Sequence, residues 1–309
     1  MFGTILFTII TFLAINGAWL APTVIDNYNL IDNLDLSEYK QKQEIKIVKS
    51  PLLKNYLNKE DEINIEAKRA VLYDPEANVF LYEKNAEEVQ AIASITKLMT
   101  ALVILDQEPD WERVYQIKNL DRREGGRIHL FLGDRVTIES LFNVSLVSSA
   151  NTATLALVHA LDLTEAEFVD LMNLKAKELG LTETYFADPV GLSSENISTA
   201  RELALLSKEA FSQEIIKNTL NQSKYSFQTE QGKTVEVEST NILLEDDLGP
   251  SSLEIINGKT GYTKEAGFCF SALYDDENSG ELITVILNSE TVFSRFNDSL
   301  KLSKWIYNY

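Results

Sequence analysis

A serine and a lysine at the start of an apolar run have the types and spacing of a nucleophile and its base. The run Ser94-Ile95-Thr96-Lys97 leads into the apolar stretch Leu98 to Leu105. On a helix, positions three apart share a face, so both side chains are expected to point into one cleft. The positive potential of a helix N-terminus favours an alkoxide there, and a desolvated lysine near another cation can act as a base. The chain has only two histidines, which favours lysine in that role.

This spacing is not specific by itself. Ser37-Glu38-Tyr39-Lys40 repeats it in a polar stretch that no apolar helix follows. That copy is interpreted as a chance occurrence, because a capping serine near a surface lysine is common. The weight given to Ser94 and Lys97 therefore depends on two patterns further along the chain.

The second pattern is Ser149-Ala150-Asn151, between the apolar stretches 138–147 and 152–161. Both stretches are predicted helices, and a short polar break between buried helices can direct a hydroxyl and an amide into a cleft. The same spacing recurs at Ser194–Asn196 and Ser239–Asn241, where a loop making local backbone bonds explains it.

The third pattern, Lys259-Thr260-Gly261, occurs once and precedes the strand-like run Ala266 to Leu273. A lysine and a threonine hydroxyl on a strand edge can clamp a carboxylate. Gly261 would let a substrate backbone approach closely. For such a tripeptide taken alone, the alternative is a turn with a solvated lysine.

The order Ser-x-x-Lys, Ser-x-Asn, Lys-Thr-Gly resembles that of penicillin-binding proteins and serine β-lactamases. The chain is further similar to the D-alanyl-D-alanine carboxypeptidase family of low-molecular-weight penicillin-binding proteins, over about residues 63–309. Besides the three motifs, the resemblance is carried by Glu66–Glu83, Gly133–Glu139, Lys175–Leu181, Phe186–Leu192 and Ser198–Ala204.

The resemblance implies a mechanism for the first two motifs. Ser94 Oγ attacks the carbonyl between two D-alanines, and Lys97 takes its proton as general base. Ser149 relays a proton to the leaving amine, while Asn151 orients Lys97 or the substrate amide. Water then hydrolyses the acyl-enzyme, and no cofactor takes part.

The resemblance also assigns the third motif and the partners. Lys259 and Thr260 bind the terminal carboxylate, Gly261 allows the approach, and the backbone N–H groups of Ser94 and Tyr262 form an oxyanion hole. The implied substrate is a peptidoglycan stem peptide ending in D-Ala-D-Ala, and β-lactam antibiotics are the expected covalent inhibitors.

Three alternatives remain open. A class A β-lactamase needs an added glutamate for deacylation, and the matching segment Phe186 to Leu192 offers only Asp188 as a carboxylate. A D-Ala-D-Ala endopeptidase acting on cross-linked peptides fits the shorter form of the family, since the sequence stops at Tyr309. A non-catalytic wall-binding sensor is disfavoured because all three motifs are intact.

Composition excludes several other classes. The formal net charge of −19 argues against nucleic acid or an anionic lipid surface as a main partner. A single cysteine, Cys269, excludes an intramolecular disulfide. His129 and His159 stand apart from each other and from any cysteine or carboxylate cluster, so no metal site is predicted.

The first 21 residues are mostly apolar and carry no charged side chain. They are long enough to span a bilayer, and Trp19 suits an interfacial anchor. A cleaved signal peptide is the alternative, disfavoured by the absence of a basic start and of a small-x-small cleavage site. We expect a membrane anchor at 1–21, a polar linker at 22–62 and an extracytoplasmic catalytic domain at 63–309.

The elements predicted around the motifs indicate an α/β (α+β) fold. Two strands are expected in 66–84, mainly helices in 94–212, strands in 225–290 and a last helix at 292–307. Helix starts are predicted at the N-cap Thr137 and at the capping boxes Thr164-x-x-Glu167 and Thr199-x-x-Glu202. This order implies a β-lactamase/transpeptidase-like antiparallel sheet built from both chain ends, with an inserted helical lobe.

Overall fold

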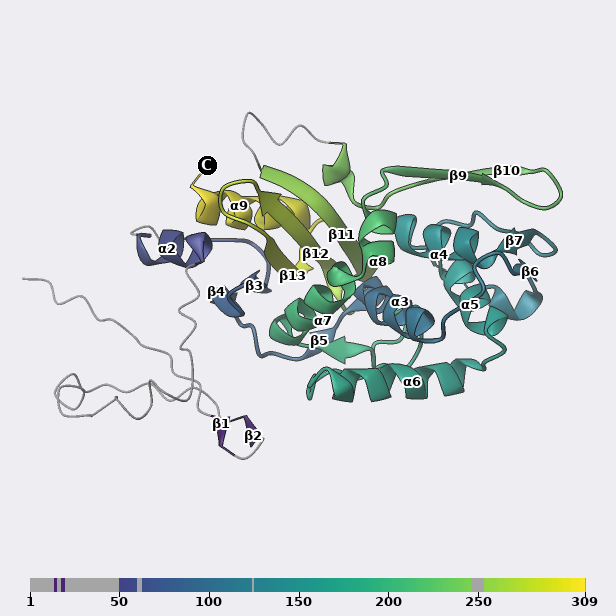
Figure 1. Ribbon diagram of the computed structural model, residues 1–309, viewed down its shortest axis with the longest axis horizontal. Coiled ribbons are helices and arrows are strands. Elements are labelled where there is room, and N and C mark those ends of the chain that lie inside the picture. Colours follow the sequence, from purple (N-terminus) through teal and green to yellow (C-terminus); the bar gives the residue numbers. More distant parts are fainter. Residues whose placement is uncertain are drawn as a thin grey trace, which may run out of the picture. The chain divides into compact units, whose positions relative to one another are not determined.

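The computed structural model describes residues 14–15, 18–19, 50–59, 63–123, 125–245 and 253–308 (Figure 1). The chain divides into residues 1–48 and 49–309. In the first unit, β1 (Ala14–Ile15) pairs antiparallel with β2 (Ala18–Trp19). The rest of the expected anchor at 1–21 lies outside the described residues. No helix in the described part of the chain is long and apolar enough to cross a membrane.

A five-stranded antiparallel sheet forms the centre of the second unit, in the order β11-β12-β13-β3-β4. Its strands are β3 (Arg69–Asp74), β4 (Val79–Lys84), β11 (Leu253–Thr263), β12 (Gly267–Asp276) and β13 (Leu282–Ser289). The early hairpin β3–β4 thus joins a sheet made by the end of the chain. The expected antiparallel sheet from both chain ends is confirmed.

Alternation along the strands divides the interior into two cores. In β3, Ala70 and Leu72 belong to one hydrophobic cluster, whereas Val71 and Tyr73 belong to the other. Successive side chains of a strand point to opposite faces, so each face of the sheet is covered by helices. Helix α9 (Ser294–Tyr307) covers one face and α7 (Ala200–Ser212) the other (Figure 1).

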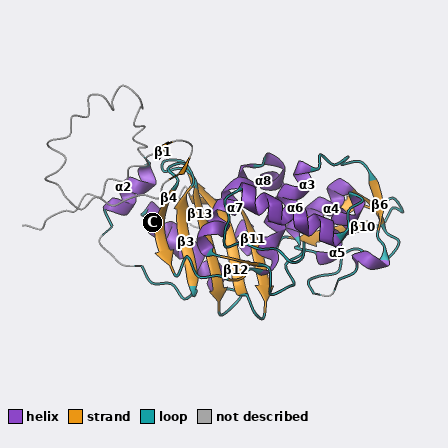
Figure 2. Cartoon of the chain, turned by 90° about the horizontal axis from the view of Figure 1, so that it is seen from below, coloured by secondary structure: helices purple, strands orange, loops and turns teal. Residues whose placement is uncertain are grey.

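The helical lobe is inserted between β4 and β11. It contains α3 (Thr96–Asp106), α4 (Ile138–Val147), α5 (Asn151–Ala160), α6 (Glu165–Glu178), α7 and α8 (Glu214–Leu220). Figure 2 shows these helices gathered beside the strands of the sheet. Every residue of α3 from Thr96 to Ile104 is buried, as expected of a helix that is apolar nearly all round.

Short strands and turns complete the lobe. They are β5 (Gln90–Ala91) with β8 (Ile197–Ser198), β6 (Val114–Gln116) with β7 (Arg135–Thr137), β9 (Lys224–Gln228) with β10 (Thr234–Glu238), and the 3₁₀ turns η2 (Ala93–Ile95), η3 (Asn119–Asp121) and η4 (Ile242–Leu244). These elements connect the helices, and η2 carries the serine of the first motif.

The predicted helix starts are largely confirmed. The hydroxyl of Thr137 accepts from the N–H of Ser140, and Thr164 forms the full capping box with Glu167. The box predicted at Thr199 is half wrong: its hydroxyl accepts from the N–H of Glu202, but the Glu202 carboxylate accepts from the Glu183 N–H, at 2.9 Å. The N–H of Glu183, from another part of the chain, thus takes the place of the Thr199 N–H as donor to the Glu202 carboxylate.

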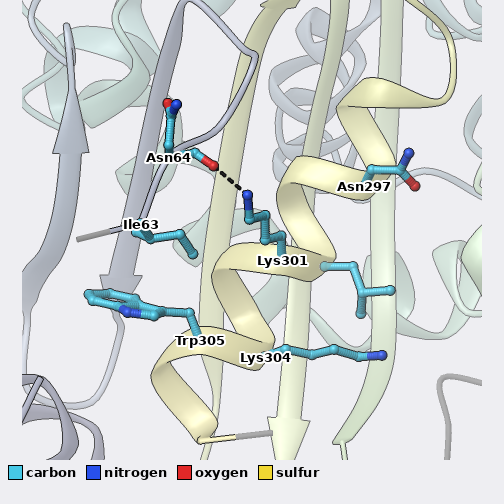
Figure 3. A pocket seen from close by; sticks show the side chains of 7 residues that line it. Ile63, Asn64, Asn297, Lys301, Lys304 and Trp305 are labelled. Carbon is cyan, nitrogen blue, oxygen red and sulfur yellow. Dashed lines mark hydrogen bonds between the residues drawn. The ribbon is translucent and has the colours of Figure 1, made fainter. Parts of the chain in front are cut away.

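Part of the segment assigned to the linker is folded. Helix α2 (Pro51–Leu57) packs on α9, and the side-chain amide of Asn55 donates to the Ile306 carbonyl at 3.2 Å. A groove runs along α9, on the face of the sheet that this helix covers (Figure 3). It is lined by Ile63, Asn64, Asn297, Leu300, Lys301, Lys304 and Trp305. None of the residues of the three motifs lines it.

Candidate active site

Ser94 lies in the 3₁₀ turn η2, two residues ahead of the first residue of α3. The turn brings Lys97 Nζ to 3.1 Å from Ser94 Oγ. Ser94 is half-buried, whereas Lys97 is fully buried. The expected i, i+3 neighbours therefore meet through a tighter turn than an α-helix, which leaves the serine hydroxyl accessible and its lysine covered.

Two glycines allow other segments to pass against this turn. A Cβ on Gly191, which has φ +86°, would lie 2.1 Å from the Ala93 carbonyl oxygen. A Cβ on Gly261 would lie 2.9 Å from the Ile92 carbonyl oxygen and 3.1 Å from the Ser94 nitrogen. Ala93 itself has φ +49°, a conformation that a non-glycine residue keeps only when its surroundings hold it there.

Lys97 is held by three acceptors. Besides Ser94 Oγ, its Nζ donates to Asn151 Oδ1 at 2.8 Å and to the Val190 carbonyl at 2.6 Å. Burial lowers the pKa of Lys97 to about 7, and the negative charge of Asp188 opposes that shift. A large fraction of this lysine is therefore neutral near pH 7 and able to take the proton of Ser94.

The Val190 carbonyl is fixed by a loop built around Asp188. One carboxylate oxygen of Asp188 accepts from the N–H groups of Val190 and Gly191 at 2.7 and 2.6 Å, and the other accepts from Ser193 at 2.5 Å. Asn196 ties down the start of the loop through its side-chain oxygen, which accepts from the Asp188 N–H at 3.0 Å. Sequence reasoning considered Asp188 only as a substitute for a glutamate, and missed this supporting role.

Ser149 occupies the break between α4 and α5 in a left-handed conformation, with φ +59°. Asn151 is the first residue of α5. The oxygen of its side-chain amide accepts from Lys97, and the Nδ2 donates to the Gly125 carbonyl at 3.1 Å. The amide thus links the loop that contains Gly125 to Lys97. Asn151 and Lys97 are both buried, and Ser149 is half-buried.

Lys259 joins the third motif to the second. It is 1% exposed, and its Nζ donates to Ser149 Oγ at 2.7 Å and to the Thr260 carbonyl at 3.0 Å. Burial holds the pKa of Lys259 well below its ordinary value, with further lowering by the positive charges of Lys97 and Arg295. The pair Ser149 and Lys259 therefore resembles the pair Ser94 and Lys97, because in each a partly exposed hydroxyl lies beside a buried amine.

Arg295 adds a third buried cation that sequence reasoning missed. It is the second residue of α9, near the end of the chain, and its Nη1 donates to the Gly261 carbonyl at 3.1 Å. Burial lowers the pKa of Arg295 to about 10. Among the described residues, no carboxylate oxygen lies within 4.0 Å of the charged nitrogens of Lys97, Lys259 or Arg295. Arg295, and each lysine when it is protonated, therefore places positive charge in the site without a close counter-ion, which suits an anionic ligand.

The remaining predicted residues lie at the end of β11. Thr260 is buried, and its hydroxyl donates to the Thr240 hydroxyl at 2.6 Å. The Tyr262 side chain is 57% exposed and stacks on Phe268, with ring centroids 4.3 Å apart. Its N–H, and that of Ser94, remain the predicted oxyanion donors.

Among the described residues, the side chains of His159 and Cys269 make no hydrogen bond to the residues of the three motifs. His159 Nδ1 lies 2.6 Å from the buried Asp121 carboxylate. Burial raises the pKa of the Cys269 thiol to about 11, as expected of a packed, unreactive cysteine. In the part of the chain that the structure describes, no three histidine, cysteine or acidic side chains gather as a metal site would need.

Comparison with known proteins gives one consistent family. A sequence model described as D-alanyl-D-alanine carboxypeptidase matches residues 56–291. The D-alanyl-D-alanine carboxypeptidase DacF of Bacillus subtilis is 32% identical over 74% of this chain, which spans 59% of that relative's length. The D-alanyl-D-alanine endopeptidase of Escherichia coli is 30% identical over 77% of this chain and 76% of its own.

Solved structures agree with this result. Penicillin-binding protein D2 of Listeria monocytogenes, in its ampicillin-bound form, has a TM-score of 0.68 and 30% identity over 80% of this chain and all of its own. The Streptomyces K15 DD-transpeptidase has a TM-score of 0.73 at 24% identity over 81% of this chain and all of its own, a likeness in fold. The expected β-lactamase/transpeptidase-like fold is confirmed.

Proposed function

Because the chain belongs to the D-alanyl-D-alanine carboxypeptidase family, we propose that it removes the terminal D-alanine from peptidoglycan stem peptides through an acyl-enzyme on Ser94. The observation that carries this proposal is the pair of hydroxyl–amine contacts, Lys97 Nζ to Ser94 Oγ and Lys259 Nζ to Ser149 Oγ, in one buried network. One pair serves the attack and the other the departure of the leaving group.

In the first step, Ser94 Oγ attacks the carbonyl carbon of the penultimate D-alanine while neutral Lys97 accepts the hydroxyl proton. The lowered pKa of Lys97, about 7, supports this role, since an ordinary lysine would be protonated. The N–H groups of Ser94 and Tyr262 receive the developing oxyanion, and such donors contribute about 3 to 4 kcal/mol each to transition-state stabilisation.

In the second step, the peptide nitrogen needs a proton to leave. Ser149 supplies it from its hydroxyl and is reprotonated with the proton that Lys97 took from Ser94, while Lys259 Nζ, 2.7 Å away, stabilises the Ser149 oxygen. Free D-alanine departs, and a water molecule then hydrolyses the ester on Ser94. The hydrogen bond from Lys97 to Asn151 keeps the general base in place during both steps.

The charge of the site supports a substrate with a free carboxylate beside the scissile bond. Thr260 presents a hydroxyl beside the buried Lys259, and the buried Arg295 contacts the neighbouring Gly261; neither side chain has a carboxylate within 4.0 Å among the described residues. A carboxylate bound there gains charge-assisted hydrogen bonds in a partly desolvated setting. Binding it also fixes the register of the peptide against Ser94.

The Asp188 loop favours a peptidase over a β-lactamase. A β-lactamase of class A needs a carboxylate that activates the deacylating water. The Asp188 carboxylate instead accepts several backbone N–H groups of its own loop, and so is committed to shaping that loop. We therefore expect β-lactams to form long-lived adducts on Ser94.

An endopeptidase acting on cross-linked peptides is the second candidate. The relatives of Escherichia coli and Haemophilus influenzae, 30% and 33% identical, carry that name. The test is to incubate the purified full chain with a pentapeptide ending in D-Ala-D-Ala and with a cross-linked dimer, following products by mass spectrometry. Release of free alanine from the pentapeptide supports the carboxypeptidase; cleavage of the dimer alone replaces it with the endopeptidase.

The location depends on the substrate. Peptidoglycan lies outside the cytoplasm, so the proposal places the catalytic part there, anchored by residues 1–21. The test is fractionation of cells that express the full chain or a variant starting at residue 22. Membrane recovery of the full chain alone supports the anchor, whereas equal release of both into the soluble fraction contradicts it.

A further inference from the structure

The Ser-x-Asn spacing also occurs at Ser239–Asn241, where a loop with local backbone bonds was expected. In the structure this segment lies against the third motif. Thr240, between these two residues, receives the hydrogen bond from the Thr260 hydroxyl, with 2.6 Å between the oxygens. Thr260 is the residue that the proposed function assigns to the substrate carboxylate. The contact therefore concerns the substrate clamp directly.

Backbone hydrogen bonds of Thr240 and of the residue before it fix this segment. The N–H of Thr240 donates at 3.1 Å to the carbonyl of Val147, the last residue of α4 and two positions before Ser149. The neighbouring Ser239 N–H donates to the Ser223 carbonyl at 2.7 Å. Thr240 thus ties the second motif to the third through its backbone and its side chain.

The direction of this hydrogen bond creates a conflict for binding. A hydroxyl has one hydrogen, and that of Thr260 is directed at Thr240. A carboxylate can only accept hydrogen bonds, so Thr260 must turn its hydrogen toward the substrate when the clamp closes. No hydrogen bond among the described residues occupies the hydrogen of the Thr240 hydroxyl, but in the present geometry only Thr260 can donate, so the Thr240 side chain must turn before it can donate back.

We propose that Thr240 is a positioning residue for the substrate carboxylate, whose hydroxyl changes from accepting to donating toward Thr260 when the substrate binds. This inference rests on the proposed function. In the bound state, Thr240 donates to Thr260, and Thr260 donates to the carboxylate. Such a chain is cooperative, because each donation polarises the next, and it ends on a charged acceptor.

The test compares a β-lactam that has a free carboxylate with one that lacks it. Benzylpenicillin and its methyl ester acylate the full-length protein, and intact-mass spectrometry gives the second-order rate for each. Thr240→Val, which keeps the shape but removes the hydroxyl, should lower the rate with benzylpenicillin about 3- to 10-fold and leave the rate with the ester unchanged.

Two further variants separate positioning from folding. Thr240→Ser keeps a hydroxyl and should restore the preference for the free acid, whereas Ser239→Ala removes a neighbouring hydroxyl that does not touch Thr260 and should leave that preference as in the wild type. Equal losses with both probes in Thr240→Val would assign Thr240 a structural role and overturn the inference. An unchanged or increased rate with the free acid would also overturn it.

The same data separate this inference from the proposed function. A wild-type protein that benzylpenicillin does not acylate overturns the proposed function, and the role of Thr240 with it. A wild type that is acylated, with a Thr240→Val variant that keeps the full preference for the free acid, overturns only the role of Thr240.

Discussion

The Nζ of Lys259 lies 2.7 Å from the Oγ of Ser149, although 110 positions separate them in the chain. This contact joins the last strand-borne motif to the break between two helices of the lobe. It brings Lys259, a buried amine with a pKa well below its ordinary value, directly beside a half-buried hydroxyl. The proposed proton transfer to the leaving amine would therefore depend on the packing of the sheet against the lobe.

Removal of the proposed nucleophile is the simplest test of the site. Ser94→Ala should give no covalent adduct with benzylpenicillin and no peptide turnover, because no other hydroxyl lies against Lys97 in its hydrogen-bond set among the described residues. Intact-mass spectrometry measures the adduct, and the melting temperature should stay near that of the wild type. Ser212→Ala, on the exposed end of α7, is the matched control. Turnover retained in Ser94→Ala would exclude the assignment.

The acylation rate should rise with pH through about 7. Lys97 must be neutral to accept the Ser94 proton, and it is protonated below its pKa of about 7. At one pH unit below that value, the rate should be about tenfold under its plateau. Stopped-flow or mass-spectrometric acylation at several pH values measures this, after controls for stability across the range. A flat profile between about pH 5.5 and 8.5 would contradict Lys97 as the base.

Asp188 should shift that profile. Its negative charge raises the pKa of Lys97 against the effect of burial, so Asp188→Asn should move the midpoint of the acylation profile to lower pH. The variant should also be less stable, by about 1 to 3 kcal/mol, because several backbone N–H groups lose a charged acceptor. An unchanged midpoint with a clear loss of stability would confine Asp188 to a structural role.

Gly191 should be irreplaceable for a reason that can be separated from backbone strain. In Gly191→Ala, the Cβ would lie 2.1 Å from the Ala93 oxygen, so the turn carrying Ser94 must move. Gly180→Ala is the control, since Gly180 also has a positive φ, +72°, but no atom within 4 Å of the added Cβ. Both variants should lose about 1 to 2 kcal/mol of stability for the left-handed conformation.

The acylation rate of Gly191→Ala should fall as well, and far more than that of Gly180→Ala. Thermal unfolding and the acylation rate with benzylpenicillin measure the two effects separately. Comparable acylation by both variants would mean that the contact of Gly191 with the nucleophile turn has no catalytic consequence.

Much of the site could be predicted from short-range sequence patterns. The spacing of Ser94 and Lys97 at the start of a buried helix predicts their contact, since residues three apart in a helix or a 3₁₀ turn lie on one side. The polar break at Ser149–Asn151 and the strand after Lys259 were also predictable from local apolar runs. The order of strand and helix patterns predicted the sheet built from both chain ends.

Other features had no local signal. The box expected at Thr199 is incomplete because the carboxylate of Glu202 finds donors near Glu183, far from its own helix start. Arg295 reaches the carbonyl of Gly261 from a helix 34 positions later, and no sequence motif marks it. Helix α2 lies in the segment expected to be a linker, and the sequence did not predict it because the helix packs on α9, far along the chain.

The sequence by itself determined which groups are available for chemistry: two serines, two lysines and an asparagine, each placed on its element by short-range patterns of apolar residues. Only the tertiary structure decided their protonation and partners. The pKa values of Lys97 and Lys259 fall because burial removes water from their ammonium groups, and burial is a property of the packed interior. The carbonyl of Val190 and the loop of Asp188 reach Lys97 through packing within the lobe, and the hydroxyl of Thr240 reaches Thr260 on β11. The spacing within any one motif encodes neither contact.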